Sequence, residues 1–154
     1  MDASEFSRQM LRHFEGRRPR VYPCSQNRLS IGFGFNLEDN DMPLEVAELW
    51  LSILEAEATE QVIGLFGLHF FNAIEGARKA ALVNLMYNMG IGSFMRFPNM
   101  IRAIRALDWQ TAAHELVTSS AGTGPSKYVR DVGERRAFFY RDLLLTGEFV
   151  DTPE

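Results

Sequence analysis

The spacing of hydrophobic and polar residues changes along the chain, and each change predicts a different kind of element. Near the N-terminus, Phe6, Met10 and Phe14 recur at helical spacing. This pattern predicts a short amphipathic helix over residues 4–14, with Ser4 as its N-cap. Gly16 is expected to end this helix, since glycine is a typical stop signal.

Strand and turn signals follow the first helix. Strand character begins at Val21, a polar turn occupies residues 25–27, and residues 28–33 return as a second strand. The Gly-Phe-Gly segment at 32–34 indicates a bulge or a close backbone contact. A third short strand is expected at 35–37, which makes a small antiparallel sheet.

From Pro43 onward the pattern is helical. A long helix keeps one apolar face through about Ile63, and Gly64 and Gly67 are expected to interrupt it. Further helices are predicted over residues 80–88, 99–106, 109–117 and 132–145, with a Ser- and Gly-rich loop at 119–126. Strands grouped at one end and helices at the other predict an α+β protein with two lobes.

Composition fits a folded, water-soluble chain. The protein has 154 residues, of which 46% are hydrophobic and 23% charged, as in ordinary globular domains. No apolar run approaches the ~20 residues that span a bilayer, so membrane insertion is not expected. The polar segment Met1–Gln9 has no secretory signal pattern. We expect a monomer.

Charge and cysteine content narrow the function classes. The net charge of −4 argues against non-specific nucleic-acid binding, which needs a basic surface. Arginines gather over residues 12–28, whereas residues 38–60 are acidic. The basic cluster either guides a polyanionic substrate or is one of two solvated faces of opposite sign. Cys24 is the single cysteine, so an internal disulfide is impossible and synthesis in a reducing compartment is expected.

Three polar side chains in the mixed region are candidates for chemistry. Glu15 ends the first helix, Cys24 follows nine residues later, and Ser30 another six residues on. If the hairpin turns near residues 26–27, the thiol and the hydroxyl face the same side of the sheet. A partly desolvated carboxyl has a raised pKa and can act as a general acid. Alternatively, Glu15 is a solvated helix end, Cys24 a small buried hydrophobe and Ser30 an ordinary strand hydroxyl.

This order of residues, followed by Ile31-Gly32-Phe33-Gly34, resembles the phage-type lysozymes of glycoside hydrolase family 24. The family has Glu, Asp and Thr at the three places, so Cys24 stands where Asp is usual and Ser30 replaces Thr conservatively. The resemblance extends over about residues 8–150. Its later parts are Arg78-Lys79-Ala80-Ala81-Leu82-Val83-Asn84, Met86-Tyr87-Asn88-Met89-Gly90, Gly133-Glu134-Arg135-Arg136 and Thr146-Gly147.

The resemblance implies a particular lobe arrangement. It predicts a single lysozyme-like domain over residues 1–154, with a small N-terminal lobe at about 12–42 that carries a three-stranded antiparallel sheet. A connecting helix is expected at about 43–63, and a helical C-terminal lobe at about 70–150. The helix at 4–14 is expected to pack on that C-terminal lobe.

The resemblance also implies a muramidase, which cleaves the β-1,4 bond between N-acetylmuramic acid and N-acetylglucosamine in peptidoglycan. Glu15 would be the general acid, and Cys24 and Ser30 would hold the attacking water. Direct attack by a Cys24 thiolate is the alternative, and Arg28 or Arg20 nearby would lower the pKa of the thiol.

Substrate-binding roles are implied for residues of both lobes. They are Tyr22, Phe35, Asn88, Asn99 and Arg136, with Arg136 the expected partner of Glu15. Phe35 stands where some family members have a histidine. Asn84 lies four residues before Asn88 on the same helix face and is a further candidate.

The biological setting that follows is a phage endolysin that lyses bacteria. It would accumulate in the host cytoplasm and reach the cell wall with help from a holin-like permeabilising protein. Two alternatives remain, a lysozyme-like glycan-binding module with impaired catalysis and a bacterial muramidase effector. No cofactor or metal is expected, because His13, His69 and His114 are scattered and only one cysteine is present.

Overall fold

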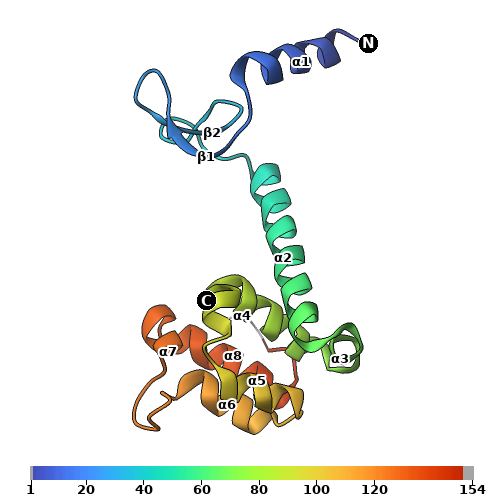
Figure 1. The fold of residues 1–154 in the computed structure, drawn as a ribbon, viewed down its shortest axis with the longest axis vertical. Helices are drawn as coiled ribbons and strands as arrows, with labels where there is room; N and C mark the ends of the chain where they lie inside the picture. The colour runs from blue at the N-terminus through green and yellow to red at the C-terminus, as the bar shows by residue number, and fades with distance from the viewer. Residues whose placement is uncertain (1, 151–154) are drawn as a thin grey trace. The chain divides into compact units, whose positions relative to one another are not determined.

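The computed structural model describes residues 2–150 and divides the chain into two compact units, a first unit at Met1–Trp50 and a second unit at Leu51–Glu154. The first unit contains α1 (Ala3–Glu15), β1 (Arg18–Pro23), β2 (Leu29–Gly32), β3 (Phe35–Asn36) and the start of α2 (Leu44–Phe66) (Figure 1). The second unit contains the rest of α2, then α3 (Leu68–Ala73), α4 (Gly76–Phe94), α5 (Pro98–Arg105), α6 (Trp109–Val117), α7 (Lys127–Val132) and α8 (Glu134–Thr146). One small antiparallel sheet beside many helices confirms the predicted α+β class.

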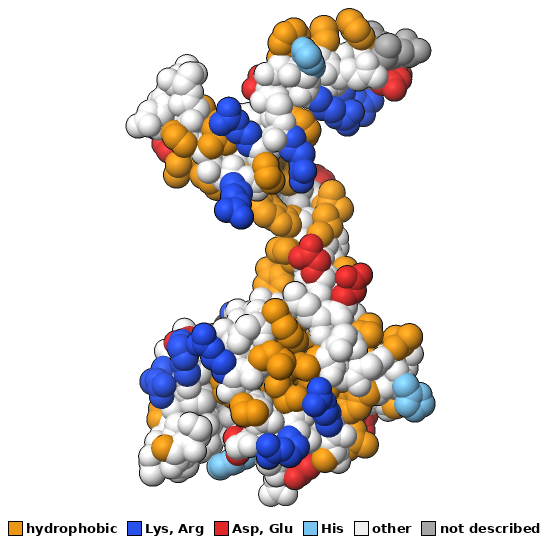
Figure 2. Space-filling view, in the orientation of Figure 1, with side chains coloured by type: hydrophobic (Ala, Val, Ile, Leu, Met, Phe, Trp, Pro, Cys, Tyr) orange, Lys and Arg blue, Asp and Glu red, His pale blue; other side chains and the backbone are white. Residues whose placement is uncertain are grey.

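Helix α1 begins earlier than predicted, because its N-cap is Asp2. The Asp2 side chain accepts a hydrogen bond of 2.8 Å from the backbone N–H of Glu5, so the prediction of Ser4 as the cap was wrong. Gly16 ends the helix with a φ of 63°, and its N–H bonds to the carbonyl of Arg12 at 3.2 Å. Figure 2 shows hydrophobic side chains along one side of α1 and basic side chains on the other.

The sheet has the order β1-β2-β3, with both pairs antiparallel. Strand β1 starts at Arg18 rather than Val21, and an irregularity in the register lies between Arg18 and Tyr22. In the central strand, Ser30 pairs with Tyr22 on one side and with Asn36 on the other. The register therefore puts Ser30 in the middle of the sheet, where 1% of it is exposed.

Two glycines behave differently from the prediction. Gly64 lies inside α2, which continues to Phe66, so the expected interruption there was wrong. The interruption predicted at Gly67 is confirmed, since its φ of 93° is incompatible with a helix, and the short helix α3 follows. Near the C-terminus, the helix predicted over 132–145 is α8, which begins at Glu134 because Gly133 has a φ of 86°. The short helix α7 before it was not predicted.

The other helical predictions agree with the structure in type and differ in length. Helix α6 has the predicted bounds, and α5 begins at Pro98, one residue before its predicted start. Helix α4 is longer than the predicted 80–88, and Gly90 at φ 71° and ψ 158° interrupts its helical geometry. Residues 2–150 contain no helix whose length and hydrophobicity would let it cross a lipid bilayer.

The hydrophobic core of the described residues belongs to the second unit. Its buried hydrophobic side chains all lie between Ala58 and Leu144, and the largest fully buried ones include Phe94, Leu82 and Leu85. Helix α8 packs against α4, α6 and α7, and α5 packs against α6. Among residues 2 and 4–50, whose burial the structure describes, Ser30 alone has a buried side chain.

Arg78 links the start of α4 to the end of α8. Its Nε donates to the carbonyl of Leu144 at 2.9 Å and its Nη2 donates to that of Leu145 at 3.0 Å. Its Nη1 lies 2.7 Å from a carboxylate oxygen of Glu75. The guanidinium also lies 4.6 Å from the ring centre of Trp109. Arg78 thereby satisfies carbonyls at the end of α8 and ties that helix to α4.

Candidate functional site

The Glu15 carboxylate lies against the turn between β2 and β3. Glu15 is the last residue of α1, and a Cβ built on Gly34 would stand 2.7 Å from Glu15 Oε2. Gly34 also has a φ of 78°, where side-chain-bearing residues are strained. Glycine at this position therefore permits both the turn and its close approach to the carboxylate. Glu15 is exposed, so the first unit does not provide the desolvation expected from sequence.

Cys24 lies in the tight turn that joins β1 to β2. Its N–H donates to the carbonyl of Arg28 at 2.8 Å, and the N–H of Asn27 donates to the Cys24 carbonyl at 2.8 Å. Asn27 completes the turn in the left-handed region, with a φ of 59°. Cys24 is partly buried. The hairpin thus turns near residues 26–27, as the sequence predicted.

The turn also favours the thiolate form of Cys24. The pKa of the thiol is lowered first by the backbone N–H of Arg28 and next by that of Gln26. Partial burial opposes this shift, and the Ser30 hydroxyl adds to it. The shift comes mainly from backbone N–H groups, and the charge of the Arg28 guanidinium, which the sequence had suggested as a cause, also interacts favourably with the Cys24 thiolate. The sulfur is a better hydrogen-bond acceptor as a thiolate than as a neutral thiol.

Ser30 lies next to the thiol on the central strand. Its Oγ is 3.5 Å from the carbonyl of Arg28, the same carbonyl that receives the N–H of Cys24. The hydroxyl also contributes to the lowered pKa of Cys24, as expected for neighbouring groups. The structure therefore brings Cys24 and Ser30 together at one end of the hairpin.

Arg28 holds this hairpin to the segment after β3. Its Nη1 lies 3.0 Å from Oε2 of Glu38, and its Nε lies 3.6 Å from Oδ2 of Asp39. The other oxygen of Glu38 accepts the N–H of Leu29 at 2.9 Å. The pKa of Glu38 is lowered first by that N–H and then by Arg28. The Arg28 guanidinium thus forms ion pairs with two carboxylates, and its role here is structural.

The two aromatic candidates of the first unit lie on the outer strands. Tyr22 pairs across the sheet with Ser30, and its ring centre is 4.4 Å from the guanidinium carbon of Arg18. Phe35 pairs with Ile31 on the other edge of the central strand. Both aromatic residues are partly buried. Sequence reasoning missed Arg18, whose signal was only its membership of the arginine cluster.

In the second unit, Asn88 joins Tyr128 and Arg136. The amide orientation that satisfies its neighbours has the Asn88 nitrogen donating to the Tyr128 hydroxyl at 3.2 Å. The Asn88 oxygen then accepts from both Nη1 and Nη2 of Arg136, each at 3.1 Å. The three residues come from α4, α7 and α8. By contrast, Asn84 donates to the carbonyl of Ala80 at 2.9 Å, within its own helix.

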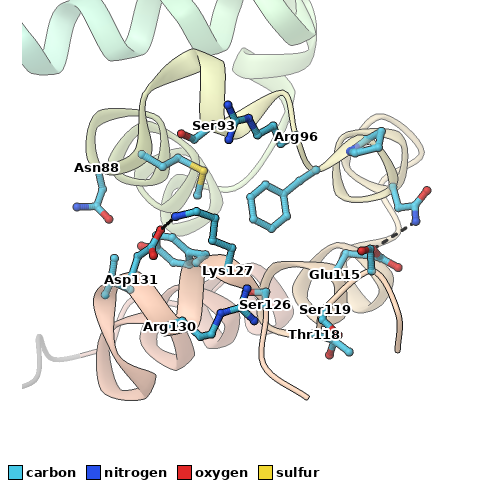
Figure 3. A pocket seen from close by; sticks show the side chains of 17 residues that line it. Asn88, Ser93, Arg96, Glu115, Thr118, Ser119, Ser126, Lys127, Arg130 and Asp131 are labelled. Carbon is cyan, nitrogen blue, oxygen red and sulfur yellow. Dashed lines mark hydrogen bonds and ion pairs between the residues drawn. The ribbon is translucent and has the colours of Figure 1, made fainter. Parts of the chain in front are cut away.

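Asn88 and Asn99 line one pocket of about 430 Å³ (Figure 3). The charged residues around it are Arg96, Glu115, Lys127, Arg130 and Asp131. Asn99 donates from Nδ2 to Glu115 at 3.4 Å, and Lys127 pairs with Asp131. Its volume lies within the range of pockets that hold small molecules, and its polar groups could bind a polar ligand by hydrogen bonds.

The predicted site residues therefore form two groups, one in each unit. Glu15, Cys24 and Ser30 belong to the first unit, and Asn88 and Arg136 to the second. A pair between Glu15 and Arg136 stays a prediction. Among residues 2–150, no group of three or more His, Cys, Asp or Glu side chains is placed to hold a metal ion.

Comparison with known proteins bears on this arrangement. No curated protein matches the chain. The family model described as phage lysozyme matches residues 12–137, which is well over half of the sequence. Every candidate site residue named above from the sequence falls inside that range. The family implies a glycoside hydrolase that acts on peptidoglycan. The chain belongs to the phage lysozyme family.

Proposed function

We propose that the protein is a muramidase that cleaves the β-1,4 bond between N-acetylmuramic acid and N-acetylglucosamine. Membership of the family supports peptidoglycan hydrolysis in general. The observation that carries the finer proposal is the close approach of the Glu15 carboxylate to Gly34, in the turn between β2 and β3 of the same small sheet whose β1–β2 hairpin bears Cys24 and Ser30. A proton donor and a water-holding pair on one small scaffold suit glycosidic bond hydrolysis.

In the proposed reaction, Glu15 donates its proton to the glycosidic oxygen as the bond to the anomeric carbon breaks. A water held by Cys24 and Ser30 adds to that carbon from the opposite face, and its proton passes to the Cys24 thiolate. The products are two shorter glycans, one with a free reducing end. In inverting enzymes of this kind the two groups stand roughly 6.5–9.5 Å apart, which leaves room for the water.

The lowered thiol pKa supports this role for Cys24. A thiolate accepts a hydrogen bond from water, and the backbone N–H groups of Arg28 and Gln26 stabilise its charge. Direct attack of the sulfur on the sugar would instead give a covalent intermediate and a retained anomer. The anomeric form of the first product distinguishes these two routes.

The second unit supplies three of the proposed substrate contacts. Asn88 and Asn99 share a polar pocket, and Arg136 is hydrogen-bonded to Asn88. By its resemblance to the family, Arg136 is the expected partner of Glu15 until substrate binds. An arginine beside a carboxylate favours the ionised acid, so substrate binding must disrupt the pair before Glu15 can donate a proton.

Replacing the proposed acid tests the function. Glu15→Gln keeps the shape of the side chain but removes the proton, and we expect clearing of permeabilised cells to slow by about 10²–10⁴-fold. Glu5→Gln is the matched control, because it changes an exposed glutamate of the same helix. Wild-type clearing by Glu15→Gln would refute the proposal. Mass analysis of the fragments separates reducing muramic acid ends from the anhydro ends of a lytic transglycosylase.

A second candidate is a glycan-binding module without catalysis. It is favoured by one feature, the cysteine at the place where the family has Asp. If wild-type protein binds peptidoglycan without cutting it, and Cys24→Asp gains cleavage, this second function replaces the first. Measurable cleavage by the wild-type protein excludes it.

The proposed setting is phage lysis of a bacterial host. The protein would remain in the host cytoplasm as a monomer until a holin-like protein opens the membrane. Expression in a bacterium tests this, since lysis is expected only after the membrane is permeabilised. A bacterial muramidase effector is the alternative source with the same chemistry.

A further inference from the structure

We propose that Tyr128 is a positioning residue, which fixes the Asn88 amide and through it the guanidinium of Arg136. The hydrogen bonds among these three residues lie wholly within the second unit and join α7, α4 and α8. This inference rests on the proposed function in one respect, because it takes Arg136 as a substrate-side residue. It concerns a residue that neither the sequence pattern nor the family match assigns.

Tyr128 is itself held firmly. The residue is 4% exposed and belongs to the hydrophobic core. Its helix is anchored by Ser126, whose hydroxyl donates to the carbonyl of Leu116 at 2.6 Å and accepts the N–H of Val129 at 3.2 Å. The ring therefore has little freedom, and its hydroxyl occupies a fixed point beside Asn88.

The hydrogen-bond pattern gives the Asn88 amide one favourable orientation. With its nitrogen toward Tyr128, its oxygen receives two N–H groups from Arg136. With the amide reversed, the NH₂ group would face the guanidinium, and two donors would meet. Burial raises the pKa of the Tyr128 phenol far above its ordinary value, so the hydroxyl stays neutral.

The remaining donors of Arg136 are then directed rather than free to rotate. A guanidinium has five N–H donors, and Asn88 uses two of them. Within the described part of the second unit, Arg136 has no ion-pair partner, and its guanidinium carbon lies 5.9 Å from the ring centre of Tyr140. Its other donors are available for a carboxylate or a sugar oxygen, with an orientation that Tyr128 and Asn88 set.

The experiment is a double-mutant cycle in the full chain with soluble peptidoglycan fragments. Tyr128→Phe keeps the ring and removes only the hydroxyl, and we expect KM to rise about fivefold with a smaller change in kcat. In an Asn88→Ala background the same change is expected to alter KM less than about twofold, because the link is already absent. Tyr87→Phe is the control, since Tyr87 is 45% exposed and takes no part in the hydrogen bonds that join Tyr128, Asn88 and Arg136.

A wild-type KM for Tyr128→Phe, or an equal effect in both backgrounds, overturns the proposal. A readout independent of activity is the NMR signal of the Asn88 side-chain NH₂ in the wild-type protein. Slow hydrogen exchange of this group, and a shift of the Arg136 Nε–H signal in Tyr128→Phe, are expected. Exchange as fast as that of a solvated asparagine overturns it. If these signals behave as expected but Arg136→Ala cleaves normally, the substrate role of Arg136 fails and the positioning holds.

Discussion

The first unit carries the candidate acid, thiol and hydroxyl with almost no buried side chains, whereas the second unit contains the hydrophobic core. Backbone geometry sets positions in the first unit. The turn at Gly34 lies against Glu15, and Cys24 lies in the turn between β1 and β2. Arg28 pairs with Glu38 and so links the hairpin to the segment after β3. Packing sets positions in the second unit, where Tyr128 is fixed by its burial.

The difference indicates which kinds of change each unit tolerates. A side chain held by packing responds most to lost volume. A site built from turns responds most to a change in backbone conformation or in a nearby hydrogen bond. Substitutions in the second unit are therefore expected to lower stability most, and substitutions in the first unit to lower activity most.

The largest expected difference is in stability. Leu85 is fully buried in the second unit, and Leu85→Ala is expected to lower the free energy of unfolding by about 2–5 kcal/mol through lost contacts and a cavity. Val21 is 50% exposed on β1, and Val21→Ala is expected to cost less than about 1 kcal/mol. Urea denaturation of both variants measures this, and equal losses would contradict the comparison.

A change at Gly34 is expected to act mainly on activity. An added methyl would stand 2.7 Å from the Glu15 carboxylate, so Gly34→Ala is expected to displace the acid and lower kcat/KM by about 10²-fold. Gly32→Ala is the matched control, because Gly32 has a φ of 67° but open space around the position of its Cβ. Both variants carry similar backbone strain of about 1–2 kcal/mol. A comparable loss of activity in both would show that strain, not the contact with Glu15, is responsible.

The pH profile tests the thiol. If a Cys24 thiolate receives the proton of water, wild-type activity rises with pH through the thiol pKa, which lies below its ordinary value. In Cys24→Asp the corresponding rise moves to about pH 4, so this variant is expected to exceed the wild type by about tenfold at pH 5. Measurement of kcat/KM from pH 4 to pH 9 decides this. Identical profiles would exclude the thiolate from the reaction.

The smallest expected effect compares two helix caps. Ser126 caps α7 within the core, and Ser126→Ala is expected to lower the free energy of unfolding by about 1 kcal/mol. Asp2 caps α1, and Asp2→Ala is expected to change amide exchange only in the first turn of that helix. A larger loss in the free energy of unfolding for Asp2→Ala than for Ser126→Ala would contradict the expectation that the second unit dominates stability.

Sequence reasoning worked best where local rules decide the structure. The bounds of α6 were predicted, since Asp108 supplies a cap and an apolar period follows it. Glycine was less informative. Gly64 lies in a helix while Gly67 and Gly133 end one, because a glycine adopts whichever φ its surroundings require. The Asp2 cap was missed because Ser4 is an equally good cap by residue type.

The candidate site was predictable in its residue types and less so in its contacts. The order Glu15, Cys24 and Ser30 indicated a hairpin opposite an acid, and the structure brings the thiol and the hydroxyl together. The cause of the lowered thiol pKa could not be predicted from sequence, because every non-proline residue has a backbone N–H and residue type does not show which of them point at the sulfur. Tyr128 was missed for a related reason, since its neighbours come from two other helices and its sequence pattern is that of a core aromatic.

The contact between Arg78 and the end of α8 bears on how the protein is synthesised. The hydrogen bond from Arg78 to Leu144 joins residues 66 positions apart, so closing it orders a long stretch of chain at once. Contacts of such high sequence separation slow folding. During translation, Arg78 can reach these carbonyls only after α8 has left the ribosome. The second unit is therefore expected to fold only after residues as far as about 146 have emerged.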